Sequence, residues 1–368
     1  MLVKERINSF IHLGQVLQEF YRQKTEIVSN PYLFSDQLAV LEQAVANSQI
    51  ENSWFTLDNI LYVIRSISSN LNSENLDFWL KPYKSALDNE TKIKTVAVIM
   101  AGNIPIVGFH DFLCVLLSGN RFLGKLSSGD KHLLPALAAI LTDNNPNWDH
   151  FIQFTREPIH SFDSVIATGS NSSSNYFQFY FSKYPHIIRR NRNSIAILTG
   201  EETAEDLSNL TVDIFLFFGL GCRSVSKIYI PERYDFSMLI QAFLSFEELL
   251  DHHKYRNNYD YFKAIFQLNL VSFIDAKNIL LKEDNSVSSP ISVLNYQYYS
   301  NWDNLLLELS VISESIQCIV GKKEAPFQWV KPGKTQIPEL WDYADAVDTM
   351  QFLFEMVNPG SKESLPRS

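Results

Sequence analysis

The region that most constrains the fold is residues 92–130, where a strand, a turn, a helix and a second strand follow one another. A β-branched run leads into a turn that contains Gly102, Asn103 and Pro105, and an apolar helix-like segment then precedes the short strand RFLGKLS. This order is typical of a parallel sheet that is covered by helices. Because strands and helices continue to alternate as far as residue 200, we predict an α/β protein.

The first 90 residues have a different pattern. Apolar residues recur at helical spacing at 4–23, 34–48 and 56–70, which predicts a mostly helical N-terminal region. A chain of 368 residues is long enough for two domains, and the pattern changes near residue 200. We therefore expect a first domain at 1–200, with the segment from about 340 to 368 packing back on it, and a second domain at 201–339.

Charge and apolar runs exclude several classes of protein. The formal net charge is −10 and no basic stripe is present, so nucleic acid is not an expected partner. The longest apolar run, at 214–222, is far shorter than the roughly 20 residues that span a bilayer, and the N-terminus lacks the pattern of a signal peptide. We therefore expect a cytoplasmic protein. Three widely separated cysteines predict neither a disulfide framework nor a metal site.

The stretch FFGLGCRSVSKIYIP, residues 217–231, contains the first candidate for chemistry. Cys222 follows a Gly-x-Gly turn and precedes a strand-like run, where backbone N–H groups can converge on an oxyanion and a thiol can reach a cleft. A cysteine is nevertheless more often a small, buried and inert side chain, which is the role we expect for Cys114 and Cys318. Taken alone, the stretch leaves both roles of Cys222 open.

Further candidates lie where predicted strands end, which is the edge at which α/β proteins place ligands. Asn103 follows the strand TVAVIMAG and could donate a hydrogen bond to an oxyanion, although a turn asparagine that caps its own backbone explains it as well. Lys125 ends the next strand, with Ser127 and Ser128 close behind. These groups suit a ribose or a phosphate, or they are an ordinary exposed strand end.

The segment ATGSNSSSN, residues 167–175, is the last candidate. Its Gly169 and Ser170 could present backbone N–H groups at a helix start to a pyrophosphate. Serine-rich turns are also common helix caps, and the segment does not match the dinucleotide-binding pattern GxGxxG. On its own, this signal is weak.

The order of these motifs resembles that of the aldehyde dehydrogenase superfamily. AGNIP, GNRFLGKLSS, TGS and GLGCRS occur in that order between predicted strands and helices. The segments MAGNIPIVG, YPHIIRRNRNSIAILTGEE and LWDYADAVDTMQFL are most similar to fatty acyl-CoA reductases related to the bacterial luminescence reductase, the LuxC-like family. The resemblance covers roughly residues 90 to 355. It implies a Rossmann-type cofactor domain and an α/β catalytic domain with a nucleophilic cysteine.

The resemblance also assigns roles to the candidate residues. Cys222 matches the family nucleophile, and Asn103 matches the amide that stabilises the oxyanion. Lys125 matches the residue that contacts the adenosine ribose or its 2′-phosphate, with Ser127 and Ser128 beside it. Gly169 and Ser170 match the turn beside the cofactor pyrophosphate and nicotinamide.

Three departures from the superfamily pattern bear on the chemistry. Hydrolysing members carry a Glu-Leu-Gly-Gly segment whose glutamate activates water, whereas this sequence has RRNRNSIAIL, with Arg189 near that position. Members that prefer NAD often have a glutamate at the position of Ser128, so NADPH is the expected cofactor here and NAD is the alternative. The stretch FQWVKPGKTQIP lacks the Glu-x-Phe-Gly-Pro pattern that holds the nicotinamide ribose.

These features together predict an NADPH-dependent acyl-CoA reductase. Without a base that activates water, a thioester on Cys222 should persist until it is reduced to an aldehyde. The acyl donor is expected to be acyl-CoA or an acyl-protein. A CoA-acylating aldehyde dehydrogenase that uses NAD and a non-catalytic binding scaffold are the two alternatives. The sequence leaves the oligomeric state open, a homo-oligomer included.

Overall fold

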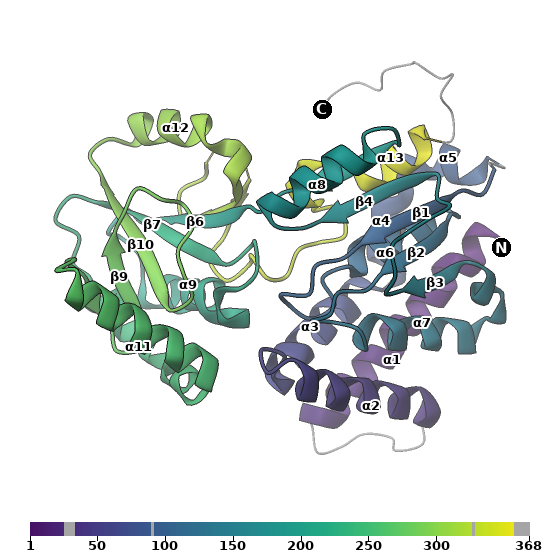
Figure 1. Cartoon of the computed structure of the whole chain (residues 1–368), viewed down its shortest axis with the longest axis horizontal. Helices are drawn as coiled ribbons and strands as arrows, with labels where there is room; N and C mark the ends of the chain where they lie inside the picture. The colour runs from purple at the N-terminus through teal and green to yellow at the C-terminus, as the bar shows by residue number, and fades with distance from the viewer. Residues whose placement is uncertain (26–33, 90–91, 326–327, 357–368) are drawn as a thin grey trace. The chain divides into compact units, whose positions relative to one another are not determined.

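The computed structural model describes residues 1–25, 34–89, 92–325 and 328–356. The chain forms two compact units (Figure 1): unit 1 is Met1–Arg190 with Glu339–Ser368, and unit 2 is Asn191–Pro338. Residues 191–200, which the sequence pattern assigned to the first domain, lie in unit 2. The reason is that strand β6 (Asn193–Ile197) pairs with two strands of that unit.

A five-stranded parallel sheet forms the centre of unit 1. Its strand order is β3 (Ile152–Thr155), β2 (Arg121–Lys125), β1 (Thr95–Ile99), β4 (Ser164–Thr168) and β5 (His186–Arg189). Each neighbouring pair of strands is parallel, as predicted. The carboxyl ends of the strands therefore meet at one edge of the sheet. The loops that carry Asn103, Lys125 and Gly169 begin at this edge.

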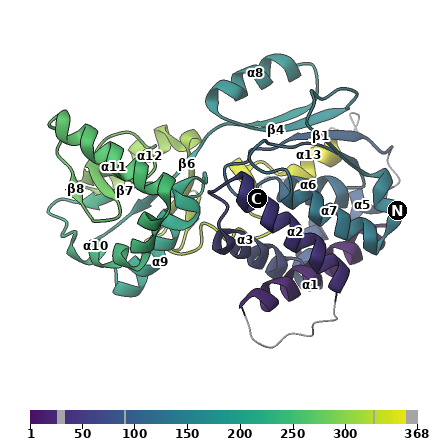
Figure 2. The same cartoon turned by 60° about the horizontal axis from the view of Figure 1, so that its bottom comes forward.

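Helices cover both faces of this sheet (Figures 1 and 2). On one face α6 (Phe109–Leu117), α7 (Leu133–Asn144) and α1 (Val3–Thr25) share a core with β1 and β2. On the other face α8 (Asn171–Phe181) packs Phe177 and Phe181 near Ala97 and Val165. The remaining helices of unit 1 are α2 (Ser35–Glu51), α3 (Leu57–Asn70), α4 (Ser73–Leu80), α5 (Lys84–Asp88) and α13 (Thr349–Glu355). The three N-terminal helices predicted from apolar spacing are thus confirmed.

A buried ion pair joins three separate segments of unit 1. The guanidinium of Arg189, at the end of β5, donates to both carboxylate oxygens of Asp111 on α6, at N–O distances of 2.5 and 2.8 Å. The same guanidinium donates to Thr349 Oγ1 at the start of α13, at 3.1 Å. Both charged side chains are less than a tenth exposed. Although burial opposes ionisation, the charge of Asp111 and its hydrogen bonds raise the pKa of Arg189 above its ordinary value.

A second polar network fixes the segment from Glu339 onwards to unit 1. The Tyr343 hydroxyl accepts from Trp79 Nε1 at 2.8 Å and lies 2.9 Å from the hydroxyl of Tyr83. Tyr83 in turn donates to the carboxylate of Asp348, which caps α13. Burial and this hydrogen bond to Asp348 raise the pKa of Tyr83 well above its ordinary value, so the phenol remains a donor.

Unit 2 contains a seven-stranded sheet. Its order is β12 (Trp329–Val330), β11 (Ile316–Gly321), β6, β7 (Val225–Pro231), β10 (Val293–Tyr299), β9 (Leu280–Glu283) and β8 (Ile274–Asp275). The strands pair in parallel except β8, which is antiparallel to β9. Helices α9 (Ala204–Phe215) and α10 (Ser237–Phe243) pack on one face, and α12 (Trp302–Val311) packs on the other. Helix α11 (His253–Leu268) completes the unit.

One predicted helix of unit 2 is shorter than its pattern suggested. The apolar spacing at 235–251 predicts a continuous α-helix, whereas α10 ends at Phe243 and a 3₁₀ segment follows at Leu244–Asp251. The backbone of Phe246 leaves the helical region, with φ −120° and ψ 26°, while its ring stacks on Phe215 at 5.3 Å. The prediction was wrong here because tertiary packing overrides the local period.

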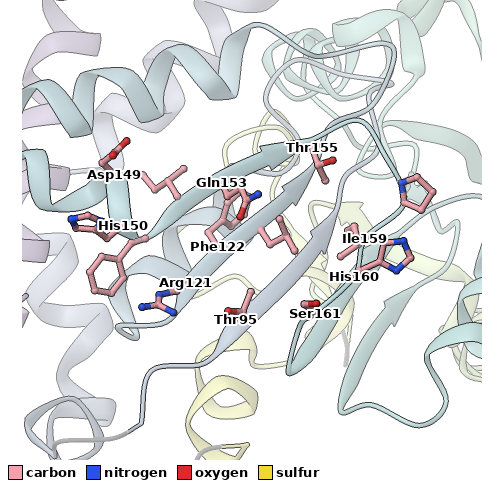
Figure 3. Close-up of a pocket in the computed structure, with 14 residues that line it drawn as sticks. Thr95, Arg121, Phe122, Asp149, His150, Gln153, Thr155, Ile159, His160 and Ser161 are labelled. Atoms are coloured by element: carbon pink, nitrogen blue, oxygen red, sulfur yellow. The ribbon is translucent and has the colours of Figure 1, made fainter.

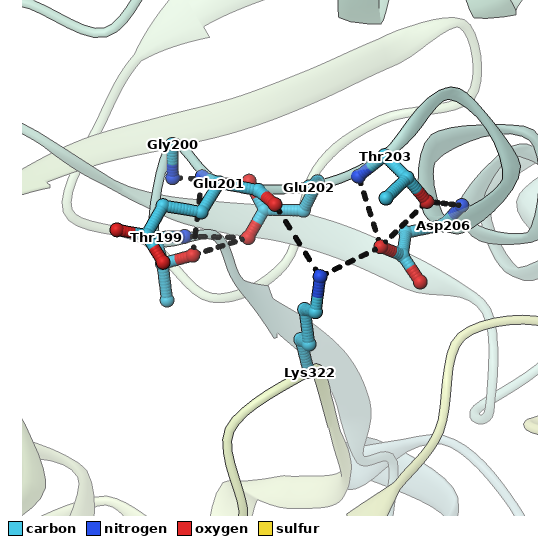
Figure 4. Close-up of polar contacts among 7 residues, drawn as sticks. All are labelled: Thr199, Gly200, Glu201, Glu202, Thr203, Asp206 and Lys322. Carbon is cyan, nitrogen blue, oxygen red and sulfur yellow. Dashed lines mark hydrogen bonds and ion pairs between the residues drawn. The ribbon is translucent and has the colours of Figure 1, made fainter.

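The loop between β6 and α9 is fixed by carboxylates (Figure 4). The Glu202 carboxylate accepts from the backbone N–H groups of Thr199 and Gly200, at 2.7 and 3.0 Å. Thr203 and Asp206 form a reciprocal capping box at the start of α9, and Lys322, just after β11, lies 3.4 Å from the Asp206 carboxylate. The end of β11 is thereby linked to the start of α9.

Among the described helices, none combines the length and the apolar character that crossing a membrane requires.

Removal of one partner of the buried ion pair should destabilise the protein strongly. In Asp111→Asn the Arg189 guanidinium stays buried without its counter-charge, so we expect the free energy of unfolding to fall by about 3–5 kcal/mol. The matched control is Glu42→Gln, which breaks the more exposed Lys24–Glu42 pair and should change stability by less than about 1 kcal/mol. Urea denaturation of the three proteins measures both effects. Equal losses in the two variants would contradict the role given to the pair.

Candidate active site

Asn103 lies exposed in the loop that follows β1. The loop is held by Asp130, whose Oδ2 accepts from the backbone N–H of Ile106 at 2.7 Å. Ile106 itself has a left-handed backbone, with φ 56°. Burial raises the pKa of Asp130 to about 6, although the backbone N–H groups of Ile106 and Leu133 favour the ionised carboxylate. The conformation of the Asn103 loop therefore depends on a carboxylate from the neighbouring loop.

The loops that follow β1 and β2 touch each other, which explains why glycine stands at positions 102 and 129. A Cβ atom on Gly102 would lie only 2.4 Å from Ser127 Oγ, and one on Gly129 would lie 2.6 Å from the carbonyl oxygen of Gly102. A larger residue at either place would push the two loops apart. Asn52, from the end of α2, donates to the Gly129 carbonyl at 3.0 Å and fixes the second loop from outside.

A cavity of about 440 Å³ opens beside these loops. Its lining includes the three predicted residues Lys125, Ser127 and Ser128. Lys125 Nζ donates to the backbone carbonyl of Arg156 at 3.0 Å, which holds the ammonium at the carboxyl ends of β2 and β3. The structure therefore brings together the residues that the sequence motif GNRFLGKLSS placed near one another.

Two cations in the same cavity were missed by the sequence motifs. Arg156 directly follows β3, and Lys131 follows the loop of Ser127 and Ser128. Lys131 forms a 3.0 Å ion pair with Glu51, whereas the Arg156 side chain is exposed and has no hydrogen bond or ion pair with the described residues. Among the described residues that line this cavity, none carries a carboxylate. The rule that selected Lys125, a polar residue at the carboxyl end of a strand, also selects Arg156.

Gly169 and Ser170 lie at the carboxyl end of β4, on the other side of β1. Gly169 packs closely on α8, because a Cβ atom there would lie 2.9 Å from the Cβ of Ser173. Ser170 is the N-cap of α8 and its Oγ accepts from the backbone N–H of Ser173 at 3.2 Å. The capping role that the sequence left open is therefore present, and the pyrophosphate role stays a prediction.

Cys222 lies exposed in a turn of unit 2, immediately before β7. Its backbone carbonyl accepts from Ser194 Oγ at 3.0 Å, which ties the turn to β6. Cys114 and Cys318 are buried, at 0% and 2% exposure, as the sequence predicts. Burial also raises the pKa of the Cys114 thiol well above its ordinary value. Cys222 is therefore the cysteine of the three whose thiol a substrate can reach.

The backbone that leads to Cys222 is strained. Phe217, Phe218 and Gly219 are consecutive left-handed residues, with φ values of 54°, 57° and 73°. A residue other than glycine in this region costs roughly 1–2 kcal/mol. Packing maintains the conformation, since both phenylalanines are buried and the ring of Phe218 lies 4.5 Å from that of His252. Strained backbone of this kind is common at functional sites.

The predicted site residues belong to both units. Unit 1 contains Asn103 and the residues predicted to bind the cofactor, and Cys222 belongs to unit 2. The roles that the resemblance gives to Asn103 and Cys222 require these two side chains to lie near each other in one site, and this stays a prediction. A further cavity, of about 530 Å³, lies along β1, β2 and β3 in unit 1, and Figure 3 shows Arg121 and Thr95 at the starts of two of these strands. It contains none of the residues predicted for the site.

The family model for the LuxC acyl-CoA reductases matches residues 35–242, which is more than half of the chain. The chain belongs to the LuxC family. The matched region includes every residue that the motifs singled out, from Asn103 to Cys222. The family resemblance inferred from AGNIP, TGS and GLGCRS is thus confirmed.

A curated relative is the long-chain acyl-protein thioester reductase of Photorhabdus laumondii subsp. laumondii. It is 23% identical over 235 residues, which are 58% of this chain and 46% of that protein. The chain therefore matches about half the length of this LuxC-type relative.

Solved aldehyde dehydrogenases have the same fold. The indole-3-acetaldehyde dehydrogenase AldA of P. syringae aligns with a TM-score of 0.60 and 11% identity, over 89% of this chain and 74% of that one. An aldehyde dehydrogenase of Bacillus cereus aligns with a TM-score of 0.59 and 12% identity, over 89% and 73%. Both were solved with NAD⁺. The fold class predicted from the sequence, aldehyde dehydrogenase-like α/β, is confirmed.

The raised pKa of Asp130 predicts a pH-dependent stability. The ordinary pKa of 3.8 becomes about 6 in the folded protein, so the folded state binds this proton more tightly than the unfolded chain. The stabilising contribution is complete below about pH 4 and is lost as the pH rises through about 6. Relative to Asp130→Asn, the wild type should lose roughly 2–3 kcal/mol of unfolding free energy over this range. Urea denaturation of both proteins between about pH 4 and pH 7 measures this loss of unfolding free energy. A constant difference between the two proteins would contradict the assignment.

Proposed function

We propose that this chain is an acyl thioester reductase that forms a covalent thioester on Cys222 and releases an aldehyde. The observation that carries the proposal is the exposure of Cys222 on a strained turn before β7, while Cys114 and Cys318 are buried. Membership of the LuxC family and the name of the Photorhabdus relative support the reaction class. Acyl-CoA or an acyl-protein is the proposed donor.

The proposed reaction begins at the Cys222 sulfur. The thiolate attacks the carbonyl carbon of the donor thioester, a new C–S bond forms, and the donor thiol leaves with its sulfur. Asn103 and the backbone N–H of Cys222 are the proposed donors to the oxyanion, as in the superfamily pattern. When bound, a nicotinamide would supply a hydride to the carbonyl carbon of the enzyme thioester, which would give the anion of a thiohemiacetal. The C–S bond of this anion would then break, which releases the aldehyde and restores the Cys222 thiolate.

The position of Arg189 supports reduction of the Cys222 thioester rather than its hydrolysis. Where hydrolysing relatives carry a water-activating glutamate, this chain has an arginine, and its guanidinium is bound to Asp111 and Thr349 inside unit 1. A buried, ion-paired guanidinium cannot accept a proton from water. The thioester should therefore survive long enough for reduction. A reductase is therefore favoured over an aldehyde-oxidising hydrolase.

The proposed cofactor is NADPH. The residues at the carboxyl ends of β2 and β3 fit its adenosine end, because Lys125, Lys131 and Arg156 line one cavity that contains no carboxylate. A 2′-phosphate placed there would meet the guanidinium of Arg156 and the ammonium of Lys125. Ser127 and Ser128 supply hydroxyl groups for the ribose. Gly169 and Ser170 are the proposed pyrophosphate and nicotinamide contacts.

Replacement of the nucleophile should abolish the covalent intermediate. We expect wild type incubated with a long-chain acyl-CoA to gain the mass of one acyl group, and Cys222→Ser to gain none, because a serine hydroxyl has no activating base here. Cys318→Ala is the matched control and should be acylated like wild type. Intact-mass spectrometry measures the adduct. An acyl adduct of full occupancy on Cys222→Ser would rule out the assignment, and aldehyde formation only with NADH and short acyl-CoA would favour a CoA-acylating aldehyde dehydrogenase.

Removal of Arg156 should affect NADPH more than NADH. A lost charge-assisted hydrogen bond weakens binding by about 1.5–3 kcal/mol, so in Arg156→Gln we expect KM for NADPH to rise roughly 10- to 100-fold. KM for NADH should stay within about twofold, since NADH lacks the 2′-phosphate. Arg121→Gln, at the opposite end of β2, is the control and should behave as wild type. Steady-state kinetics with both cofactors measure the ratio, and an equal rise for NADPH and NADH would exclude a 2′-phosphate contact.

A further inference from the structure

The segment Gly333–Pro338 lacks the Glu-x-Phe-Gly-Pro pattern of the superfamily, but it makes a defined set of contacts in unit 2. The carboxylate of Asp213, on α9, accepts from the backbone N–H of Gly333 at 2.6 Å and from that of Thr335 at 3.0 Å. The Thr335 hydroxyl donates to the same carboxylate at 2.7 Å. Asp213 and Thr335 are both fully buried. The segment is therefore fixed to α9 by three hydrogen bonds to one carboxylate.

The other side of this segment contacts the turn that carries Cys222. The carbonyl oxygen of Thr335 accepts from Arg223 Nε at 2.6 Å, and Gln336 Nε2 donates to Ser224 Oγ at 3.3 Å. Arg223 and Ser224 are the two residues that follow Cys222. A continuous chain of hydrogen bonds thus runs from α9 through Thr335 to the residue adjacent to the cysteine.

The electrostatics of this series of hydrogen bonds favour an ionised Asp213 with all of its donors in place. Burial raises the pKa of Asp213 to about 6, while its hydrogen bonds from Thr335 and Gly333 and the positive charge of Arg223 favour the ionised form. At neutral pH the carboxylate is therefore charged and needs all of its donors. Hydrogen bonds to a charged group are stronger than those between neutral groups, and a buried charge without them is strongly unfavourable. The carbonyl of Thr335 is consequently held in one place.

The contacts on the opposite side complete the support of the turn. Ser194 Oγ, on β6, donates to the carbonyl of Cys222 itself at 3.0 Å. The peptide before Arg223 is therefore held by β6, and the Arg223 side chain is held by Thr335. The hydrogen bonds from Ser194 and to Thr335 together restrict the orientations of the turn that carries the exposed thiol.

We propose that Asp213 and Thr335 are positioning residues for Cys222, and that they act through Arg223 to fix the orientation of the turn that presents the thiol. This inference rests on the proposed function for the chemical role of Cys222. Asp213 lies outside the superfamily motifs discussed above, and Thr335 lies in the stretch that lacks the Glu-x-Phe-Gly-Pro pattern. In this chain the segment Gly333–Pro338 thus supports the nucleophile turn.

The expected consequence is a slower attack by the thiol without a weaker substrate complex. In Thr335→Val the hydroxyl that binds Asp213 is replaced by a methyl group of similar size, so the carbonyl that receives Arg223 loses part of its restraint. A nucleophile that samples more orientations reacts more slowly, and misplacements of about 1 Å reduce rates up to about 100-fold. We expect the rate of Cys222 acylation at saturating acyl-CoA to fall about tenfold, with the half-saturating concentration within about twofold of wild type.

Two further variants separate positioning from general stability. Thr335→Ser keeps the hydroxyl and should restore the acylation rate to within about twofold of wild type. Thr211→Val is the matched control, because Thr211 is a buried threonine on α9, the helix of Asp213. Its hydroxyl donates to the backbone carbonyl of Ser208, at 2.6 Å, and to no other described residue. Its melting temperature should fall as in Thr335→Val, while its acylation rate stays that of wild type. Asp213→Asn, which keeps the size of the side chain, should slow acylation at least as much as Thr335→Val.

The experiment measures acylation by quenched-flow intact-mass spectrometry with a long-chain acyl-CoA, and alkylation of the exposed thiol with iodoacetamide. Wild-type acylation rates in folded Thr335→Val or Asp213→Asn would overturn the inference. So would a slow Thr335→Ser or an equally slow Thr211→Val. If wild type itself forms no acyl adduct, the proposed function fails, and alkylation then decides the positioning role. Equal alkylation rates in wild type, Thr335→Val and Asp213→Asn would overturn it, and altered rates in the latter two alone would support it.

Discussion

The bidentate ion pair between Arg189 and Asp111 sets the arrangement of unit 1. Asp111 belongs to the helix that follows the Asn103 loop, Arg189 ends strand β5, and Thr349 begins the C-terminal helix α13. Two buried charges are tolerable only while they face each other with their hydrogen bonds made. A shift of the helix, the strand or α13 would break this condition. The Asn103 loop, which precedes α6, therefore leads into a helix that this ion pair holds to β5 and α13.

Most of the regular structure could be predicted because its signal is local. Between residues 92 and 200, the apolar pattern of each strand and helix indicates which of its faces is buried. The alternation of these elements then predicts a parallel sheet. The ion pair could not be predicted in this way, because its members are 78 residues apart and Thr349 is another 160 residues from Arg189. The 3₁₀ segment at 244–251 has the apolar spacing of a helix, and the stacking of Phe246 on Phe215 decides otherwise.

The candidate site was predictable to a similar extent. Lys125 was predicted from its position at the end of a strand and from the motif GNRFLGKLSS, whereas Arg156, which follows the neighbouring parallel strand β3, lies outside any motif and was missed. The exposure of Cys222 could not be derived from the residue type, since cysteines are commonly buried. The turn that carries it comes after three left-handed residues, two of them phenylalanines, which pack on partners such as His252. Sequence patterns contain little information about such contacts.

The course of the chain has a consequence for how the protein is made. Unit 2 is inserted within unit 1, because the segment from Glu339 returns to contact helices formed some 230 to 265 residues earlier. During synthesis, every residue of unit 2 has been added once Pro338 is in place, whereas unit 1 still lacks Tyr343, Asp348 and Thr349. Until they arrive, Arg189 lacks its contact with Thr349 and Trp79 lacks its contact with Tyr343. Unit 2 can therefore complete its fold on the ribosome first, and the larger unit, although begun earlier, is the last to close.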